Sequence, residues 1–164
     1  MRYSEPLTNL QVNTLDYLYR KSAEMNVHYL DDMKIIIQNA GLDADSLPRI
    51  TKYIAEEAPI IIHFNMSRSI HAYLLDHRYR NLFETNTSGG SKSRVNRIKW
   101  EGYLFDERYS FAEDEERIKY GVMNFVNDVK GIKSCSGYGS SFMVLNKNVR
   151  RRCTITNKRK YGPG

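Results

Sequence analysis

The residue types best suited to bind a ligand are concentrated between residues 77 and 90. This segment reads HRYRNLFETNTSGG, and Ser91 follows it. Its threonine and serine hydroxyls can donate hydrogen bonds to ligand oxygens, whereas Gly89 and Gly90 permit positive φ angles and close backbone approach. Arg78 and Arg80 add fixed positive charge. The mixture suits a ligand that carries phosphate or sugar, although a run such as Asn-Thr-Ser-Gly-Gly-Ser is also common in solvated turns.

Three residues outside this segment have side chains that suit the same site. His63 closes an apolar run, Arg68 follows it by five residues, and Tyr120 lies in a later Arg-Ile-Lys-Tyr-Gly segment. A histidine can hydrogen-bond a ribose, and an arginine near a helix start can hold a phosphate. Each residue also has a structural alternative: His63 as a core histidine bonded to backbone, Tyr120 as a core aromatic, and Arg68 as a surface charge.

The sequence excludes several common functional classes. It contains no Ser-His-Asp order, Walker loop or G-x-G-x-x-G motif, which removes the commonest hydrolase and nucleotide-binding assignments. Cys135 and Cys153 form no CxxC or Cys/His ligand cluster, so we expect no metal site and reduced thiols in a cytosolic environment. No run approaches the roughly 20 apolar residues of a membrane span, and the start lacks the apolar core of a secretory signal. We therefore expect no membrane partner.

Charge is distributed unevenly along the 164 residues, whose net charge is +6. Residues 1–57 contain six basic and nine acidic residues, a balance of −3, whereas residues 58–164 contain nineteen basic and ten acidic residues, a balance of +9. This division indicates two functional regions, of which the basic one faces an anionic ligand or partner. A nucleic acid and a dinucleotide are both candidates at this point.

Hydrophobic periodicity predicts helices over residues 8–22, 29–40 and 45–56. Thr8 or Asn9 can cap the first helix, Gly41 can end the second, and Asp45 or Ser46 can cap the third. Residues 1–57 are therefore expected to form a helical subdomain. An amphipathic, acidic subdomain in front of a basic domain suits the docking of a protein partner.

The periodicity changes to that of a strand at Pro59. The run from Ile60 to Phe64 is rich in isoleucine, which predicts a central strand over residues 59–65 that is buried on both faces. A helix over residues 67–76 with Ser67 at its cap, and further strands over residues 117–125 and 142–145, are expected to follow. Residues 130–139 have the composition of a glycine-punctuated connection. The fold class that these elements predict is α+β.

The order of several short motifs resembles one family of bacterial proteins, the CteC-like ADP-ribosyltransferase effectors. The motifs are HFNxxR at 63–68, RYRNLFETNTSGG at 78–90, WE at 100–101, ERxKYG at 116–121 and GYGSS at 137–141. The resemblance covers roughly residues 59–157. The helical first third contributes no motif to it.

This resemblance implies a PARP-like ADP-ribosyltransferase fold, in which residues 1–57 are the helical subdomain and residues 58–164 form a split-sheet core that binds NAD. NAD is then the co-substrate, and ADP-ribose is transferred to a threonine of host ubiquitin, which blocks ubiquitination. The resemblance also implies a bacterial effector toxin that is delivered into the host cytosol. Nucleic acid is not an expected partner of such an enzyme.

The same resemblance assigns roles to individual residues. The expected cofactor-binding residues are His63, Phe64, Asn65, Arg68, Arg78, Thr85, Thr87, Ser88, Gly89 and Tyr120. Glycosidic cleavage passes through an oxocarbenium-like state that needs a nearby carboxylate, and Glu84 and Asp76 are the carboxylates nearest the motif.

Enzymes of this fold place their glutamate on a late strand, beyond the stretch that corresponds to residues 150–155, and no Q-x-E or E-x-E motif follows that stretch here. The chain is therefore a piece of a longer protein, or uses another carboxylate, or is a non-catalytic relative. We favour the first reading, because residues 158–164 complete no recognisable element, so that the core is expected to be incomplete at its C-terminal end.

Two other classes of function remain open. A basic nucleic-acid-binding module would use the nineteen basic residues after position 57, including Arg150–Arg152 and Lys158–Lys160 with tyrosines nearby. The sequence contains no RNP-like strand, helix-turn-helix signature or zinc framework, so the transferase hypothesis is favoured. A third hypothesis is a partner-docking helical region attached to a scaffold without catalysis.

Overall fold

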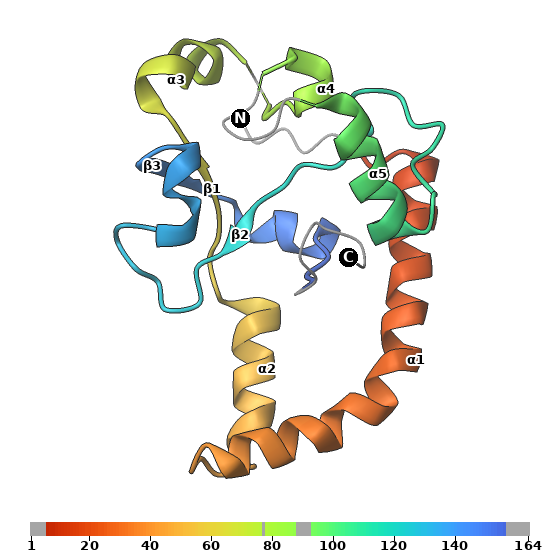
Figure 1. Cartoon of the computed structure of the whole chain (residues 1–164), viewed down its shortest axis with the longest axis vertical. Helices are drawn as coiled ribbons and strands as arrows, with labels where there is room; N and C mark the ends of the chain where they lie inside the picture. Colours follow the sequence, from red (N-terminus) through yellow and green to blue (C-terminus); the bar gives the residue numbers. More distant parts are fainter. Residues whose placement is uncertain (1–5, 77, 88–92, 157–164) are drawn as a thin grey trace.

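The structure is a computed structural model that describes residues 6–76, 78–87 and 93–156 (Figure 1). Helices surround a small antiparallel sheet, so the expected α+β class is confirmed. Within the described ranges, no helix is both long and apolar enough to span a membrane. The elements are α1 (Asn9–Asn39), α2 (Ser46–Glu56), β1 (Ile60–Phe64), α3 (Met66–Leu75), α4 (Leu82–Thr85), α5 (Arg94–Phe105), β2 (Val122–Met123), η1 (Lys133–Tyr138), β3 (Ser141–Val144) and η2 (Lys147–Arg152). The elements η1 and η2 are 3-10 helices.

Helix α1 is one continuous helix, so the expectation of two separate helices over residues 8–22 and 29–40 was wrong. Residues 23–28 contain neither glycine nor proline, and nothing in them ends a helix. At the start, Thr8 and Gln11 form a reciprocal capping box. At the end, Gly41 takes a φ of +74°, its N–H donates to Gln38 O, and the N–H of Leu42 donates to Ile37 O. This is a Schellman motif, for which glycine is the preferred residue.

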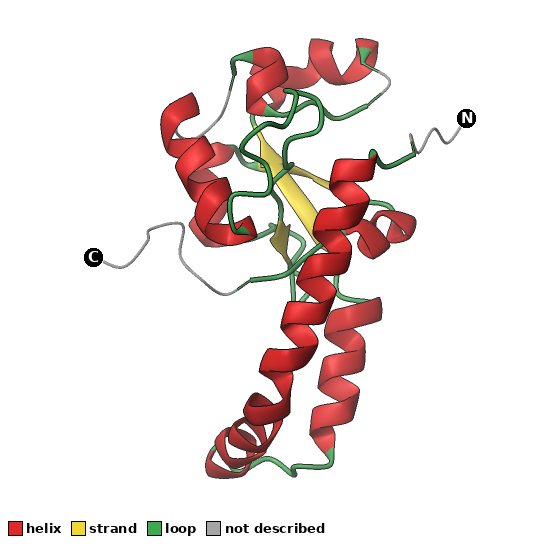
Figure 2. Cartoon of the chain, turned by 90° about the vertical axis from the view of Figure 1, so that its right-hand side faces the viewer, coloured by secondary structure: helices red, strands yellow, loops and turns green. Residues whose placement is uncertain are grey.

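The first half of α1 packs against α5. Leu10 and Leu18 contact the buried cluster formed by Phe105, Tyr109 and Ala112. Gln11 Nε2 donates to the carbonyl of Glu116 at 2.9 Å, and Lys21 Nζ lies 2.5 Å from a carboxylate oxygen of Asp106. The helical region is thus attached to the rest of the chain along half of α1. Its distal part, where the end of α1 meets the start of α2, extends away from the sheet (Figures 1 and 2).

Strand β1 is the central strand of a three-stranded sheet with the order β2-β1-β3, as predicted. It pairs antiparallel with both neighbours, and His63 lies opposite Phe142 on β3. Strand β3 also lies within one residue of its predicted position. Strand β2, by contrast, is only two residues long, whereas a strand over residues 117–125 was expected. The side-chain amide of Asn81 donates to the carbonyl of Arg117 at 3.1 Å, so this carbonyl is bonded to a side chain instead of a neighbouring strand.

The residue that caps α3 is Asn65, where Ser67 had been expected. Asn65 has an extended backbone, and its side-chain oxygen accepts from the N–H of Arg68 at 3.3 Å and from the hydroxyl of Ser67 at 2.7 Å. Asparagine at this position satisfies a helix N–H that has no partner within the helix. The turn from β1 into α3 is therefore fixed by the residue that directly follows the strand.

Arg150 connects the C-terminal segment to the end of α2. Its Nη1 donates to the carbonyls of Ile54 at 2.7 Å and Ala55 at 3.3 Å, and its Nη2 donates to the carbonyl of Ala58. Carbonyls in the last turn of a helix lack partners within the helix and attract a cation. One member of the expected nucleic-acid-binding run 150–152 thus stabilises the fold.

We predict that Arg150→Ala lowers the free energy of unfolding by about 1.5–3 kcal/mol, because several backbone carbonyls lose hydrogen bonds to a charged group. Urea denaturation followed by circular dichroism measures the effect. Arg151→Ala is the matched control, since the Arg151 side chain is exposed, and we expect a change within about 0.5 kcal/mol. Equal stability of both variants would mean that the Arg150 contacts contribute nothing to the fold.

Candidate functional site

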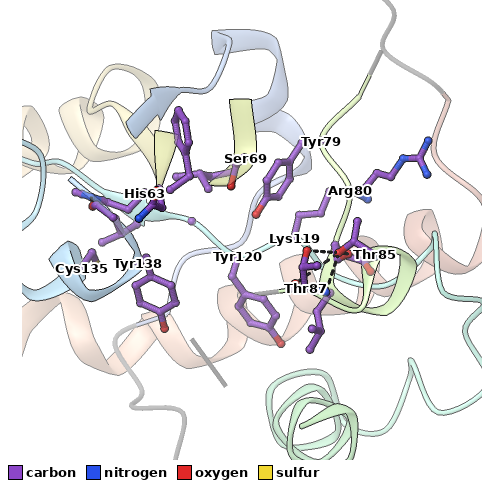
Figure 3. A pocket seen from close by; sticks show the side chains of 18 of the residues that line it. His63, Ser69, Tyr79, Arg80, Thr85, Thr87, Lys119, Tyr120, Cys135 and Tyr138 are labelled. Carbon is purple, nitrogen blue, oxygen red and sulfur yellow. Dashed lines mark hydrogen bonds between the residues drawn. The ribbon is translucent and has the colours of Figure 1, made fainter. Parts of the chain in front are cut away.

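A cleft of about 1020 Å³ lies beside the sheet and is formed by segments that are far apart in the sequence. Its size is at the upper end of the roughly 300–1,000 Å³ typical of small-molecule sites. In Figure 3, His63, Cys135 and Tyr138 lie on one side, whereas Thr85, Thr87 and Lys119 lie on the other. Tyr79 and Tyr120 lie between the two sides.

Eight of the twelve site residues expected from the sequence line this cleft. They are His63, Phe64, Asn65, Arg68, Asp76, Thr85, Thr87 and Tyr120. Glu84 and Arg78 are not among the lining residues, and Ser88 and Gly89 lie outside the described residues. Thr85 and Thr87 share the cleft with His63, and the hydroxyl of Thr87 donates to that of Thr85 at 3.0 Å.

Positive charge dominates the cleft. Among its described lining residues there are four cations, Arg68, Arg80, Arg97 and Lys119, and one carboxylate, Asp76. Asp76 is paired with Arg80 at 2.9 Å, whereas Arg68, in the first turn of α3, has no ion pair among the described residues. Such a balance raises the local concentration of anionic ligands. Arg97 was not among the residues expected from the sequence.

Three tyrosines, Tyr79, Tyr120 and Tyr138, line the cleft together with Phe64 and Phe83. Burial, reinforced by the negative charge of Glu101, raises the pKa of Tyr120 to about 12. Burial also raises the pKa of Tyr79, although the charge of Arg97 opposes this. Both hydroxyls therefore stay protonated at neutral pH. The guanidinium carbon of Arg97 lies 4.8 Å from the ring centre of Tyr120, so a buried cation packs on the aromatic wall.

Both ring nitrogens of His63 are hydrogen-bonded to backbone. The N–H of Ile132 donates to Nε2 at 3.0 Å, so Nε2 is an acceptor and the ring proton is on Nδ1. Nδ1 in turn donates to the carbonyl of Gly139 at 3.0 Å. This is the structural alternative that the sequence left open for His63. Its ring borders the cleft with both nitrogens occupied.

Glu84 and Arg78 bind each other beside the cleft. The carboxylate of Glu84 accepts from the N–H of Asn81 at 2.9 Å, which completes the capping box of α4, and lies 2.5 Å from Arg78 Nη2. Burial alone would raise the pKa of Glu84, but the bonds from Arg78 and Asn81 outweigh it and the pKa is lowered. The lowered pKa and these partners indicate that Glu84 is ionised and braces the segment that carries Thr85 and Thr87.

Sequence reasoning missed a second buried ion pair behind the cleft. Glu101 is 1% exposed, and its Oε2 accepts from Arg117 Nη1 at 2.7 Å, whereas Oε1 has no hydrogen-bond partner among the described residues. Burial raises the pKa of Glu101, and the bond from Arg117 partly offsets this. The spacing of Arg97 and Glu101 places both on one face of α5, which is a signal that the sequence did contain.

We predict that Glu84→Gln lowers the free energy of unfolding by about 1–3 kcal/mol at pH 7. A carboxylate with a lowered pKa stabilises the fold above its unfolded pKa of about 4.3, and this contribution is lost as the pH falls through the folded value. The difference between variant and parent should therefore shrink in acid, which urea titrations between pH 3 and pH 7 measure. Glu115→Gln, at an exposed site, is the control and should change little at any pH. A constant difference at all pH values would contradict the proposed ionic role.

Comparison with known proteins identifies one family. Residues 59–162 match a family described as "Protein of unknown function (DUF3626)". This range contains all the segments that line the cleft and excludes the whole helical region of residues 1–57. No curated protein and no solved structure matches the chain.

Proposed function

The chain belongs to the DUF3626 family of proteins of unknown function, and we propose that it is a CteC-like, NAD-dependent mono-ADP-ribosyltransferase with a PARP-like core. One observation carries the proposal. Of the five motifs on which the resemblance rests, four contribute residues to the same cleft, those at 63–68, 78–90, 116–121 and 137–141, whereas the pair at 100–101 does not. Positions separated by more than 70 residues have no local reason to share one surface. A common ligand accounts for their convergence.

The composition of the cleft supports NAD as that ligand. NAD carries two phosphates, two riboses and two aromatic rings, and the cleft offers Arg68 and Lys119 for charge, Thr85 and Thr87 for hydroxyl contacts, and tyrosine faces for stacking. Its volume of about 1020 Å³ is sufficient for a dinucleotide. Within the described residues, no group of three or more His, Cys, Asp or Glu side chains could hold a metal ion.

In the proposed reaction the bond between nicotinamide and ribose C1 breaks, and nicotinamide leaves with the bonding electrons. The hydroxyl oxygen of the acceptor threonine then bonds to C1 and gives its proton to a base. Of the two carboxylates expected to act, Asp76 lines the cleft and Glu84 is held beside it. We assign Asp76 the stabilisation of positive charge at C1, and its ion pair with Arg80 keeps it oriented.

We predict that Arg68→Ala weakens NAD binding about 10- to 150-fold, because a charge-assisted contact of about 1.5–3 kcal/mol is lost. Isothermal titration calorimetry with NAD measures this, and Arg151→Ala should bind as the parent does. Affinity should depend weakly on salt, because NAD has two phosphates.

Asp76→Asn should abolish transfer of labelled ADP-ribose to ubiquitin while NAD still binds.

The alternative is a basic nucleic-acid-binding module. Each phosphate contact of such a module contributes about 0.7–0.9 to the slope of log affinity against log salt. Tight RNA binding with a slope of several units, together with no NAD binding, would overturn the transferase proposal. The inward orientation of Arg150 disfavours this alternative, because one of the three clustered arginines already binds three backbone carbonyls.

We further propose that the distal helical region docks ubiquitin, the partner that the resemblance implies. Met25, Tyr29, Met33 and Ile36 recur at helical spacing on α1 and are between 42% and 58% exposed. This apolar stripe lies in a region with a net charge of −3, which suits a partner that combines an apolar patch with basic residues. Delivery into a host cytosol belongs to the same proposal, and the free thiols of Cys135 and Cys153 suit a reducing compartment.

We predict that Tyr29→Arg and Met33→Arg each weaken ubiquitin binding at least tenfold, because anchor residues at the centre of an interface contribute about 2 kcal/mol or more. Surface plasmon resonance with immobilised ubiquitin measures the affinity. NAD binding should be unchanged, since the stripe is remote from the cleft. Phe111→Arg, at an apolar site that is 99% exposed, is the control. An equal loss in the control would show that the stripe is not the docking surface.

A further inference from the structure

One wall of the cleft is a short segment with little internal support. Residues 134–139 line the cleft and include Cys135 and Tyr138, which face it in Figure 3. Most of this segment is η1, a single 3-10 helix of six residues, whose N-cap Ile132 provides no side-chain hydrogen bond. Short 3-10 helices have poor hydrogen-bond geometry and rarely hold their conformation alone. Contacts with the rest of the fold must therefore hold this wall in place.

His63 supplies those contacts at both ends of the segment. The N–H of Ile132, the N-cap, donates to Nε2, and Nδ1 donates to the carbonyl of Gly139, the C-cap, each at 3.0 Å. A single imidazole thus performs the role that two capping side chains have in a longer helix. The ring itself is held on β1, the central strand, and packs on the ring of Phe142 with centres 5.6 Å apart.

Two glycines allow this close approach. A Cβ on Gly131 would lie 2.6 Å from Nε2 of His63, and a Cβ on Gly139 would lie 2.0 Å from the carbonyl oxygen of Phe64. Both glycines also have positive φ angles, +74° and +138°, which other residues rarely adopt. The segment is therefore shaped at both of its ends to fit against the histidine and its strand.

We propose that His63 is a positioning residue that caps residues 132–139 at both ends and thereby fixes one wall of the cleft. Its ring nitrogens hold the protein's own backbone and do not contact the ligand. The effect of this residue on a ligand is exerted through Cys135, Tyr138 and their neighbours. The expectation that this wall contributes to NAD binding rests on the proposed function. The capping of residues 132–139 by His63 does not depend on that function.

The test uses three variants of the full chain. His63→Phe keeps a ring against Phe142 but removes both hydrogen bonds. His63→Gln places an amide oxygen near the position of Nε2, and His63→Asn places an amide nitrogen near that of Nδ1, so each restores one bond. His71→Phe is the matched control, because His71 is exposed on α3. All are made in a Cys153→Ser background, where Cys135 is the remaining cysteine.

Two measurements report how firmly residues 132–139 are held: the hydrogen-exchange rate of the Ile132 amide by NMR, and the rate at which a thiol reagent labels Cys135. A hydrogen bond worth about 0.5–1.5 kcal/mol corresponds to an increase of roughly 2- to 13-fold in exchange when it is lost. We expect His63→Phe to raise both rates, His63→Gln to restore slow exchange at Ile132, and His71→Phe to change neither. Unchanged rates in His63→Phe would overturn the proposal.

NAD titration separates this inference from the proposed function. If the parent binds NAD, His63→Phe should weaken binding and His63→Gln should recover part of it. Loss of NAD binding in His63→Phe with exchange and labelling unchanged would identify His63 as a direct ligand contact and overturn the positioning role. If the parent does not bind NAD, the transferase proposal fails, and the exchange and labelling rates still decide whether His63 caps the segment.

Discussion

The backbone pairing of β1 with β3 is the interaction on which the cleft depends. Residues 61–64 of β1 lie opposite residues 141–144 of β3, which places His63 beside Phe142. The wall segment, residues 132–139, directly precedes β3 in the chain and therefore lies at the C-terminal end of β1. The same end of β1 continues into α3, whose cap Asn65 directly follows the strand. A shift of this register by one residue would turn His63 to the opposite face and remove both of its backbone bonds. Two sides of the cleft are therefore set by one pair of strands.

The opposite side of the cleft depends on Asn81. This buried residue accepts hydrogen bonds from the N–H groups of Phe83 and Glu84 and donates to the carbonyls of Asp114 and Arg117. It therefore caps α4 and joins that helix to the segment that carries Lys119 and Tyr120. Since all of its polar positions are used, no shorter or apolar side chain could replace it without leaving buried groups unpaired.

Signals that are local in the sequence predicted helix in α1, α2 and α3 and the strands β1 and β3, whereas α4, α5, η1 and η2 were not predicted. The isoleucine run of β1, the Thr8 cap and the glycine after α1 each determine structure within a few residues, and each lies where it was expected. The roles of charged residues were harder to predict, because they depend on partners that only the fold supplies. Glu84 braces α4 because packing brings Arg78 to it, and Glu101 is buried because Arg117 reaches it from sixteen residues away. The sequence identified the cleft residues as a group, but it could not distinguish those that face the cleft from those that support it.

The contacts of Arg150 have a mechanical consequence. Three residues separate the end of α2 from the start of β1, and Ala58 among them is fully buried with its carbonyl held by Arg150. Such a connection behaves as a stiff joint, so a rotation of α2 carries the central strand with it. The distal helices are thus joined to the central strand of the sheet by a connection of three residues that Arg150 holds in place. A displacement of the distal helices would therefore reach β1, and with it the cleft, through the backbone that joins α2 to β1.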